Sequence, residues 1–297
     1  MTSPDRAILD PEIRRRIANL TLTARKAVEG MLSGVHRSPH RGASVVFVEH
    51  REYRPGDDLR LLDWRAYARS DRHTIKRFEQ ETQLRATLVL DQSASMDYGS
   101  PITKGDHAAT LLAALALVLV RQGDAAGVVR FAEDVLARLP ARSRPAHLEL
   151  ALGELAQPIA QGARTDLKQA LTSVAEQAGR RGVVAIASDL LDFDDHALAP
   201  IDQLVHRGHD VWVFQVMHPD ELELPFEGPT RFVGLEGEDP IEVDPDALRA
   251  KYKAELGTFL DACRARCAAV GARHRLVRTD EPIERVLAEA LARGGRR

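Results

Sequence analysis

Residues 88–96 read LVLDQSASM, and this stretch decides the fold that we expect for the whole chain. With the two residues before it, its apolar part forms the run ATLVLD, which is typical of a strand buried on both faces of a parallel sheet. The run ends at Asp91, and serines follow at alternate positions, Ser93 and Ser95. We therefore expect a buried strand whose carboxyl end carries three polar side chains.

Strand and helix patterns alternate along the rest of the chain, as in a parallel sheet with right-handed crossovers. Strands are predicted at residues 86–91, 127–132, 135–140, 182–189, 210–217 and 274–279, the third of them as an antiparallel neighbour of the second. Helices are predicted at residues 106–120, 146–157, 165–178, 195–206, 245–270 and 282–292. The prediction for residues 83–297 is an α/β fold with a mostly parallel sheet flanked by helices.

Two smaller features complete the predicted organisation. ELELPF, TRFVGLE and PIEVD predict a β-rich insertion of short strands near residues 221–244. Apolar residues at helical spacing predict an opening helix over residues 11–32, and strands at 44–49 and 73–78 are expected to pair with each other. We predict that residues 1–82 form an N-terminal helix and β elaboration, in which the acids and arginines of residues 51–72 make either an internal salt-bridge network or a binding surface.

Composition excludes several classes of protein. With 297 residues, 44% of them hydrophobic, and a net charge of −3, the chain is an ordinary globular protein with no general attraction for nucleic acid. The N-terminus lacks the residue order of a secretory signal, and the apolar run 108–120 is too short to span a bilayer. Cys263 and Cys267 lie four residues apart on a predicted helix that holds them too rigidly for easy disulfide closure. We expect a cytoplasmic protein with reduced thiols and no membrane span.

Polar side chains gather at the predicted carboxyl ends of the strands, where open α/β sheets place their ligands. Asp91, Ser93 and Ser95 follow the first strand, Asp189 closes a later one, and Thr165 lies at a helix start, where it can also act as the cap. Two carboxylates and three hydroxyls are hard oxygen ligands. This set suits Mg²⁺, or Mn²⁺ or Ca²⁺, and suits zinc poorly.

The motifs of competing catalytic sites do not match. Ser93 is flanked by Gln92 and Ala94 instead of the glycines of a nucleophile elbow. Residues 98–106, YGSPITKGD, lack the spacing of a Walker phosphate loop. A phosphatase that uses Asp91 as nucleophile is expected to carry an acid two positions on, where this chain has Ser93.

The same residues carry a resemblance. Asp-x-Ser-x-Ser at Asp91, Ser93 and Ser95, followed by Thr165 and Asp189, is similar to the metal-ion-dependent adhesion site of von Willebrand factor A domains. The flanking stretches REYRPGDDLRLLDWRAYARSDRHTIKRFEQET and LPFEGPTRFVGLEGEDPIEVDPDALRAKYKAEL resemble the domain of unknown function 58 family. The resemblance runs from about residue 41 to the C-terminus and implies a von Willebrand factor A-like fold.

The resemblance also implies roles for the five residues. Ser93 and Ser95 would ligate the ion directly, Thr165 directly or through water, and Asp91 and Asp189 largely through water. With neutral oxygens next to it, the ion keeps much of its charge and can accept a carboxylate from a partner protein. The family further implies work alongside a MoxR-type AAA+ ATPase. Asp97 and Asp192 are additional carboxylates near the site.

Three hypotheses for the function follow. The first is a cation-dependent protein-interaction module, an adaptor in the assembly or remodelling of complexes, with no catalytic residues. The second is a Mg²⁺-dependent hydrolase or phosphotransferase that uses Asp91, with His107 as its general acid or base. The third is a scaffold whose metal site is vestigial.

Overall fold

The computed structural model describes residues 11–34, 47–52, 74–78, 84–159, 165–179, 181–237 and 239–294. The chain divides into two compact units, one of residues 39–83 and one that combines residues 1–38 with residues 84–297. In the smaller unit β1 (Phe47–Glu52) pairs antiparallel with β2 (Thr74–Phe78), so the predicted pairing is confirmed. The loop between them, with its acids and arginines, lies outside the described residues.

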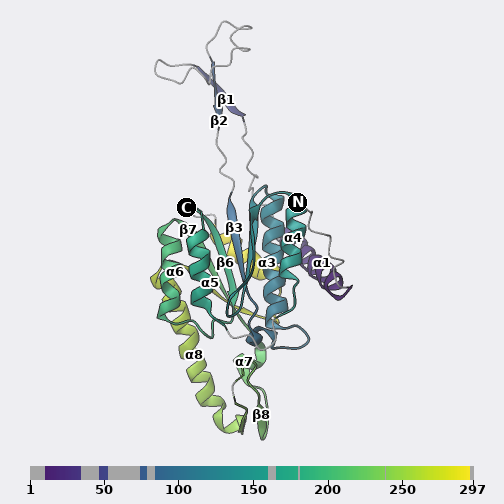
Figure 1. The fold of residues 1–297 in the computed structure, drawn as a ribbon, viewed down its shortest axis with the longest axis vertical. Helices are drawn as coiled ribbons and strands as arrows, with labels where there is room; N and C mark the ends of the chain where they lie inside the picture. The colour runs from purple at the N-terminus through teal and green to yellow at the C-terminus, as the bar shows by residue number, and fades with distance from the viewer. Residues whose placement is uncertain are drawn as a thin grey trace, which may run out of the picture. The chain divides into compact units, whose positions relative to one another are not determined.

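The larger unit is built on a six-stranded sheet of order β10-β7-β6-β3-β4-β5 (Figure 1). Its strands are β3 (Arg85–Asp91), β4 (Ala125–Phe131), β5 (Val135–Arg142), β6 (Gly182–Ser188), β7 (His209–Met217) and β10 (Arg273–Arg278). Neighbouring strands are parallel except for β5, which runs antiparallel to β4 at the edge. The predicted α/β class and all six strands are confirmed.

Helices cover both faces of this sheet (Figure 1). One layer contains α1 (Pro11–Gly34), α3 (Lys104–Arg121), α4 (Pro145–Leu155) and α9 (Ile283–Gly294). The other contains α5 (Leu167–Gln177), α6 (Asp195–His206) and α8 (Pro245–Ala269). Leu88 and Leu90 of β3 face the first layer and Val89 faces the second, which explains why the strand is apolar at successive positions.

Helix α3 is buried on nearly all sides, which accounts for the apolar run that is too short to cross a membrane. It packs against the sheet and also against α1, α4 and α9. No helix in the described part of the chain combines the length and the apolar composition that a membrane span needs.

Helix α1 belongs to the larger unit. Its apolar stripe of Leu20, Ala24, Ala27, Val28 and Met31 is buried in the same core as α3. The prediction places α1 and the β elaboration together in residues 1–82, whereas the structure assigns only residues 39–83 to the unit that contains the β elaboration. The reason is tertiary packing: the stripe of α1 is the cover that one side of α3 requires.

The insertion near residues 221–244 is only partly β. Its hairpin of β8 (Thr230–Phe232) and β9 (Ile241–Val243) is confirmed. The predicted strand in ELELPF is wrong, because this segment begins in the short helix α7 (Pro219–Glu223). His218 caps α7, accepting a bond from the backbone at Asp220, while the Glu221 side chain accepts from the His218 N–H.

The two cysteines of α8 are unpaired and buried, as predicted. Burial raises the pKa of the Cys263 thiol to about 11 and that of Cys267 to about 12. Both thiols are therefore protonated and unreactive at neutral pH.

The packing of α1 on α3 yields a stability prediction. Val28, which is 1% exposed, should not tolerate a charge, so Val28→Asp is expected to destabilise the protein by about 3 kcal/mol or more. In thermal unfolding this corresponds to a fall in Tm of about 6 °C or more. Leu22→Asp is the matched control, because Leu22 lies on the same helix and is 55% exposed. Equal effects of the two substitutions would show that α1 does not pack as described.

Candidate metal centre

Asp91 is the last residue of the central strand β3, and its side chain is completely buried. One carboxyl oxygen accepts the backbone N–H of Ser93 at 2.9 Å, and the other accepts the hydroxyl of Ser188 at 2.6 Å. Ser188 ends the neighbouring strand β6. Asp91 thus ties together the ends of two strands and fixes the turn that follows β3.

Without a bound cation, ionisation of the Asp91 carboxyl costs more free energy in the folded protein than in water. Burial, and after it the nearby charge of Asp189, raises its pKa from 3.8 to about 7, although the bonds from Ser188 and Ser93 oppose this shift. A cation next to this group would favour its ionised form. A cation bound at the end of β3 would therefore be stabilised by the Asp91 carboxylate that it helps to ionise.

The hydroxyls of Ser93 and Ser95 lie side by side after Asp91, with their oxygens 3.0 Å apart. Both serines are buried, in the turn that leads through the 3₁₀-helix η2 (Ala94–Asp97). Adjacent oxygens of an octahedral magnesium ion, at about 2.1 Å from the metal, are themselves about 3 Å apart. The spacing of this pair fits two neighbouring ligands of such an ion.

Thr165 lies directly before α5, but the cap of that helix is Asp166, which accepts the N–H of Gln169. The expectation that Thr165 caps the helix is therefore wrong, and its hydroxyl contacts Glu236 at 3.4 Å instead. The same oxygen of Glu236 is 3.4 Å from the backbone nitrogen of Ser95. The structure thus brings Thr165 and Ser95 to a common carboxylate that sequence reasoning had not included.

Asp189 follows β6 and is bonded to a buried lysine. The Lys104 ammonium donates to Asp189 at 2.8 Å and to Glu221 at 2.7 Å, and the lysine side chain is 1% exposed. Burial alone would lower the pKa of Lys104, but Asp189 and Glu221 outweigh it and raise that pKa. With Lys104 bonded to it, Asp189 fits an outer position, bound to an ion through water, better than a direct one.

Sequence reasoning missed Lys104, although one signal was present. A lysine in the first turn of a helix is opposed by the helix dipole, so its presence indicates an acidic partner. Lys104 opens α3 nine residues after Ser95, and its partners lie 85 and 117 residues further along the chain.

The site opens into a cavity of about 680 Å³ between the end of the sheet and the β8–β9 hairpin. Ser95, Thr165 and Lys104 line it, together with Asp192, Asp220, Glu221 and Glu236. Among the described lining residues there are thus four carboxylates and one ammonium, with Leu224, Phe226, Phe232 and Tyr252 forming apolar walls. Burial, and then the charge of Asp166, raises the pKa of Asp192. Asp97 is exposed and is not part of this lining.

These residues fit a hard divalent cation. Paired hydroxyls, a buried carboxyl that a cation would help to ionise, and an acid-rich opening are the ligand chemistry of magnesium and its relatives. Among the described residues no group of three or more His, Cys, Asp or Glu side chains is arranged to hold a metal. A metal at this site would therefore depend on Ser93, Ser95 and Thr165, with Asp91 and Asp189 behind them.

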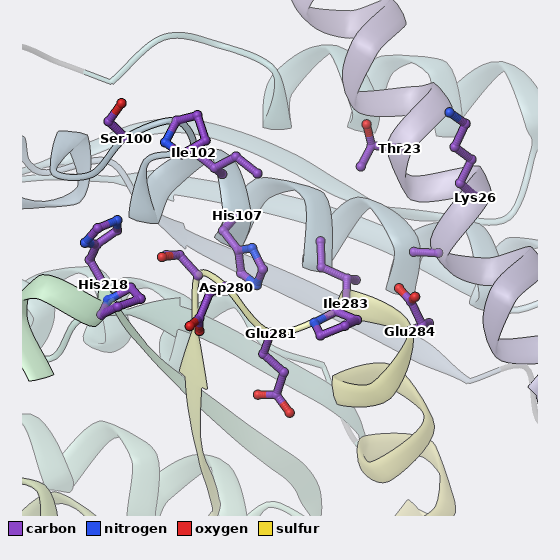
Figure 2. A pocket seen from close by; sticks show the side chains of 15 residues that line it. Thr23, Lys26, Ser100, Ile102, His107, His218, Asp280, Glu281, Ile283 and Glu284 are labelled. Carbon is purple, nitrogen blue, oxygen red and sulfur yellow. The ribbon is translucent and has the colours of Figure 1, made fainter. Parts of the chain in front are cut away.

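His107 lies in a different cavity, of about 620 Å³, lined by α1, the start of α3 and the turn after β10 (Figure 2). Figure 2 shows its ring directed toward Asp280 and Ile283. Burial lowers the pKa of His107 to about 4, so the ring is neutral at physiological pH. None of the five predicted site residues lines this cavity, so the geometry gives His107 no role next to Asp91.

The model of a family described as protein of unknown function DUF58 matches residues 49–258. The uncharacterized protein Rv1480 of Mycobacterium tuberculosis (strain ATCC 25618 / H37Rv) is 31% identical over 268 residues, which cover 86% of this chain and 84% of that protein. The uncharacterized protein Mb1516 of Mycobacterium bovis (strain ATCC BAA-935 / AF2122/97) matches with the same identity and coverage.

Solved structures with a similar arrangement include the conserved hypothetical protein BatB from Bacteroides thetaiotaomicron, at 18% identity and a TM-score of 0.44, over 71% of this chain and 98% of that one. A von Willebrand factor type A structure from Catenulispora acidiphila matches at 15% identity and a TM-score of 0.37, over 71% of this chain and 42% of that one. At these values the α/β fold class rests on the strand order and helix layers described above. By the match to its model and by these relatives, the chain belongs to the DUF58 family of proteins of unknown function.

Proposed function

We propose that this protein is a divalent-cation-dependent interaction module that binds a partner through a metal held by Ser93, Ser95 and Thr165. The observation that carries the proposal is the pair of buried hydroxyls, 3.0 Å apart, beside the buried Asp91 at the end of the central strand. Neutral ligands leave the ion with most of its charge, so it attracts a carboxylate of the partner at its open position. Mg²⁺ is the ion that the hydroxyl spacing favours, with Mn²⁺ and Ca²⁺ as alternatives.

The surface around the cavity supports recognition of a protein. Leu191, Val233 and Leu235 are 56%, 62% and 44% exposed, and each of them lines the acidic cavity. Exposed apolar side chains around a charged centre are typical of protein-binding surfaces. The family resemblance favours a MoxR-type AAA+ ATPase as the partner, and two unreactive thiols suit work in the cytoplasm.

We further propose that the protein is not an enzyme. A nucleophilic Asp91 would have to reach a substrate, whereas its side chain is fully buried and is held in place by hydrogen bonds to both of its oxygens. His107, the proposed general acid or base, lines the other cavity. No observation favours phosphoryl transfer or hydrolysis over recognition.

Magnesium is expected to stabilise the wild-type protein and not the double variant Ser93→Ala/Ser95→Ala. A ligand at 100 times its Kd adds about 2.7 kcal/mol to the free energy of unfolding, which corresponds to a rise in Tm of about 5 to 10 °C. Differential scanning fluorimetry across a magnesium titration measures this. Ser173→Ala is the control, because that hydroxyl bonds Arg138 at 2.6 Å, away from the site. A double variant that keeps the wild-type response would refute the ligand assignment.

Asp91→Asn is expected to separate stability from metal binding. Folding raises the pKa of Asp91 to about 7, so the stabilisation that its protonated form gives is present below pH 4 and is lost as the pH rises through 7. The asparagine keeps an acceptor oxygen for the Ser93 N–H and can donate its NH2 group to the Ser188 oxygen, without this loss, which has an upper limit on the order of 4 kcal/mol. Urea unfolding in EDTA at pH 5 and pH 8 should show a smaller fall in stability for the variant. Magnesium should no longer stabilise it; an unaltered metal response would contradict the role of Asp91.

Affinity capture from a lysate of the native organism tests the docking itself. Wild type and Ser93→Ala/Ser95→Ala are each used as bait with magnesium and with EDTA, and the retained proteins are identified by mass spectrometry. A partner is expected only with wild type in magnesium, and an AAA+ ATPase among the retained proteins would support the proposed partner class. Retention of the same proteins in all four conditions would refute metal-mediated docking.

A further inference from the structure

Glu236 reaches the candidate metal centre from the connection between β8 and β9. Its Oε1 atom lies 3.4 Å from the backbone nitrogen of Ser95 and 3.4 Å from the hydroxyl of Thr165. These contacts join segments 141 and 71 residues apart in sequence. A carboxylate of the same chain therefore contacts two of the residues of the candidate metal centre, where a partner's carboxylate is proposed to dock.

The segment that carries Glu236 is built like a short displaceable loop. Val233 and Leu235 precede the glutamate with 62% and 44% of their surfaces exposed, so neither anchors the loop in the core. Gly237 follows it at a φ of +94°, a left-handed conformation that favours glycine, and a Cβ atom there would meet nothing within 4 Å. Glu236 is thus presented to the cavity by a segment with exposed side chains before it and open space beside Gly237.

Acidic side chains among the described residues near Glu236 favour a bound cation. Asp192 lines the same cavity; burial, and then the charge of Asp166, raises its pKa, and the charge of Glu236 adds to this shift. The Lys104 ammonium is bonded to Asp189 and Glu221. A divalent ion beside the serines would favour the ionised forms of these acids.

We propose that Glu236 is an internal ligand of this metal centre, which occupies the docking position until a partner's acidic side chain replaces it. The inference rests on the proposed function. It also specifies the partner's chemistry: a glutamate or aspartate on a short loop with aliphatic neighbours, as in the VGLEG sequence of residues 233–237. The apolar walls formed by Phe226 and Phe232 would receive those neighbours.

A first test measures metal binding alone. Isothermal titration calorimetry with MnCl₂ and MgCl₂ is expected to give an affinity about tenfold lower for Glu236→Gln than for wild type, because one carboxylate of the centre is lost. Glu242→Gln is the matched control, since Glu242 is an exposed glutamate of β9 in the same hairpin. Hydrogen exchange followed by mass spectrometry should show that metal protects residues 233–237 in wild type and not in Glu236→Gln. Circular dichroism establishes that each variant is folded.

A second test measures competition for the docking position. The acetylated peptide FVGLEG, a copy of residues 232–237, is titrated in magnesium against wild type and Glu236→Gln. An internal ligand has an effective concentration in the millimolar range, so the peptide should bind the variant at least about tenfold more tightly than the wild type. The peptide FVGLQG should bind neither protein.

The outcomes separate this inference from the function on which it rests. If wild type binds metal and Glu236→Gln matches it in metal affinity, loop protection and peptide binding, Glu236 is not an internal ligand, whereas the metal-dependent module stands. If wild type binds no metal, both proposals fall. Weaker metal binding together with stronger peptide binding in Glu236→Gln, and neither change in Glu242→Gln, would support the internal ligand.

Discussion

The rest of the site depends on one constraint, the burial of a carboxyl group at the end of the central strand. Asp91 is fully buried where a parallel sheet exposes its ligand-binding edge, and the N–H of Ser93 and the hydroxyl of Ser188 satisfy its oxygens. These bonds hold the turn in which the Ser93 and Ser95 oxygens come within 3.0 Å of each other. The arrangement that buries Asp91, which is unfavourable for its ionised form, therefore also places the two serines side by side. A cation would stabilise the ionised form of Asp91 and would take the two serine hydroxyls as ligands.

Lys104 and its two acidic partners place further charged groups at the same edge of the sheet. A buried ammonium between Asp189 and Glu221 pairs both acids, and Asp189 lies close enough to act on the pKa of Asp91. Because Glu221 lies on α7, this ion pair also ties the insertion to the end of the sheet. The lysine carries one positive charge, and four carboxylates are among the described residues that line the cavity with it.

The sequence allowed the sheet to be predicted because each central strand is buried on both faces, as in the continuous apolar run around Val89 of β3. Asp91, Ser93 and Ser95 were predictable since all three follow that run directly. Glu236 was not, because a single loop glutamate has no local signal, and its contacts are with residues 71 and 141 positions away. The grouping of α1 failed for a similar reason: its apolar stripe predicts a helix with one buried face but does not say that α3 lies against it.

The proposed centre suits recognition because the hydroxyls of Ser93 and Ser95 are neutral ligands, and Asp91 would act on the ion from behind them. The full burial of Asp91 is a further argument against its proposed use as a nucleophile. An internal carboxylate would raise the affinity that a partner needs. A partner that offered only an acidic side chain would compete poorly against a loop that is tethered at the site. To displace Glu236, a partner must also gain free energy by burying apolar surface against Leu191 and the walls of the cavity. Under the proposed mechanism the exposed aliphatic residues and the acidic loop would act together, and selectivity would arise from the requirement for both contacts.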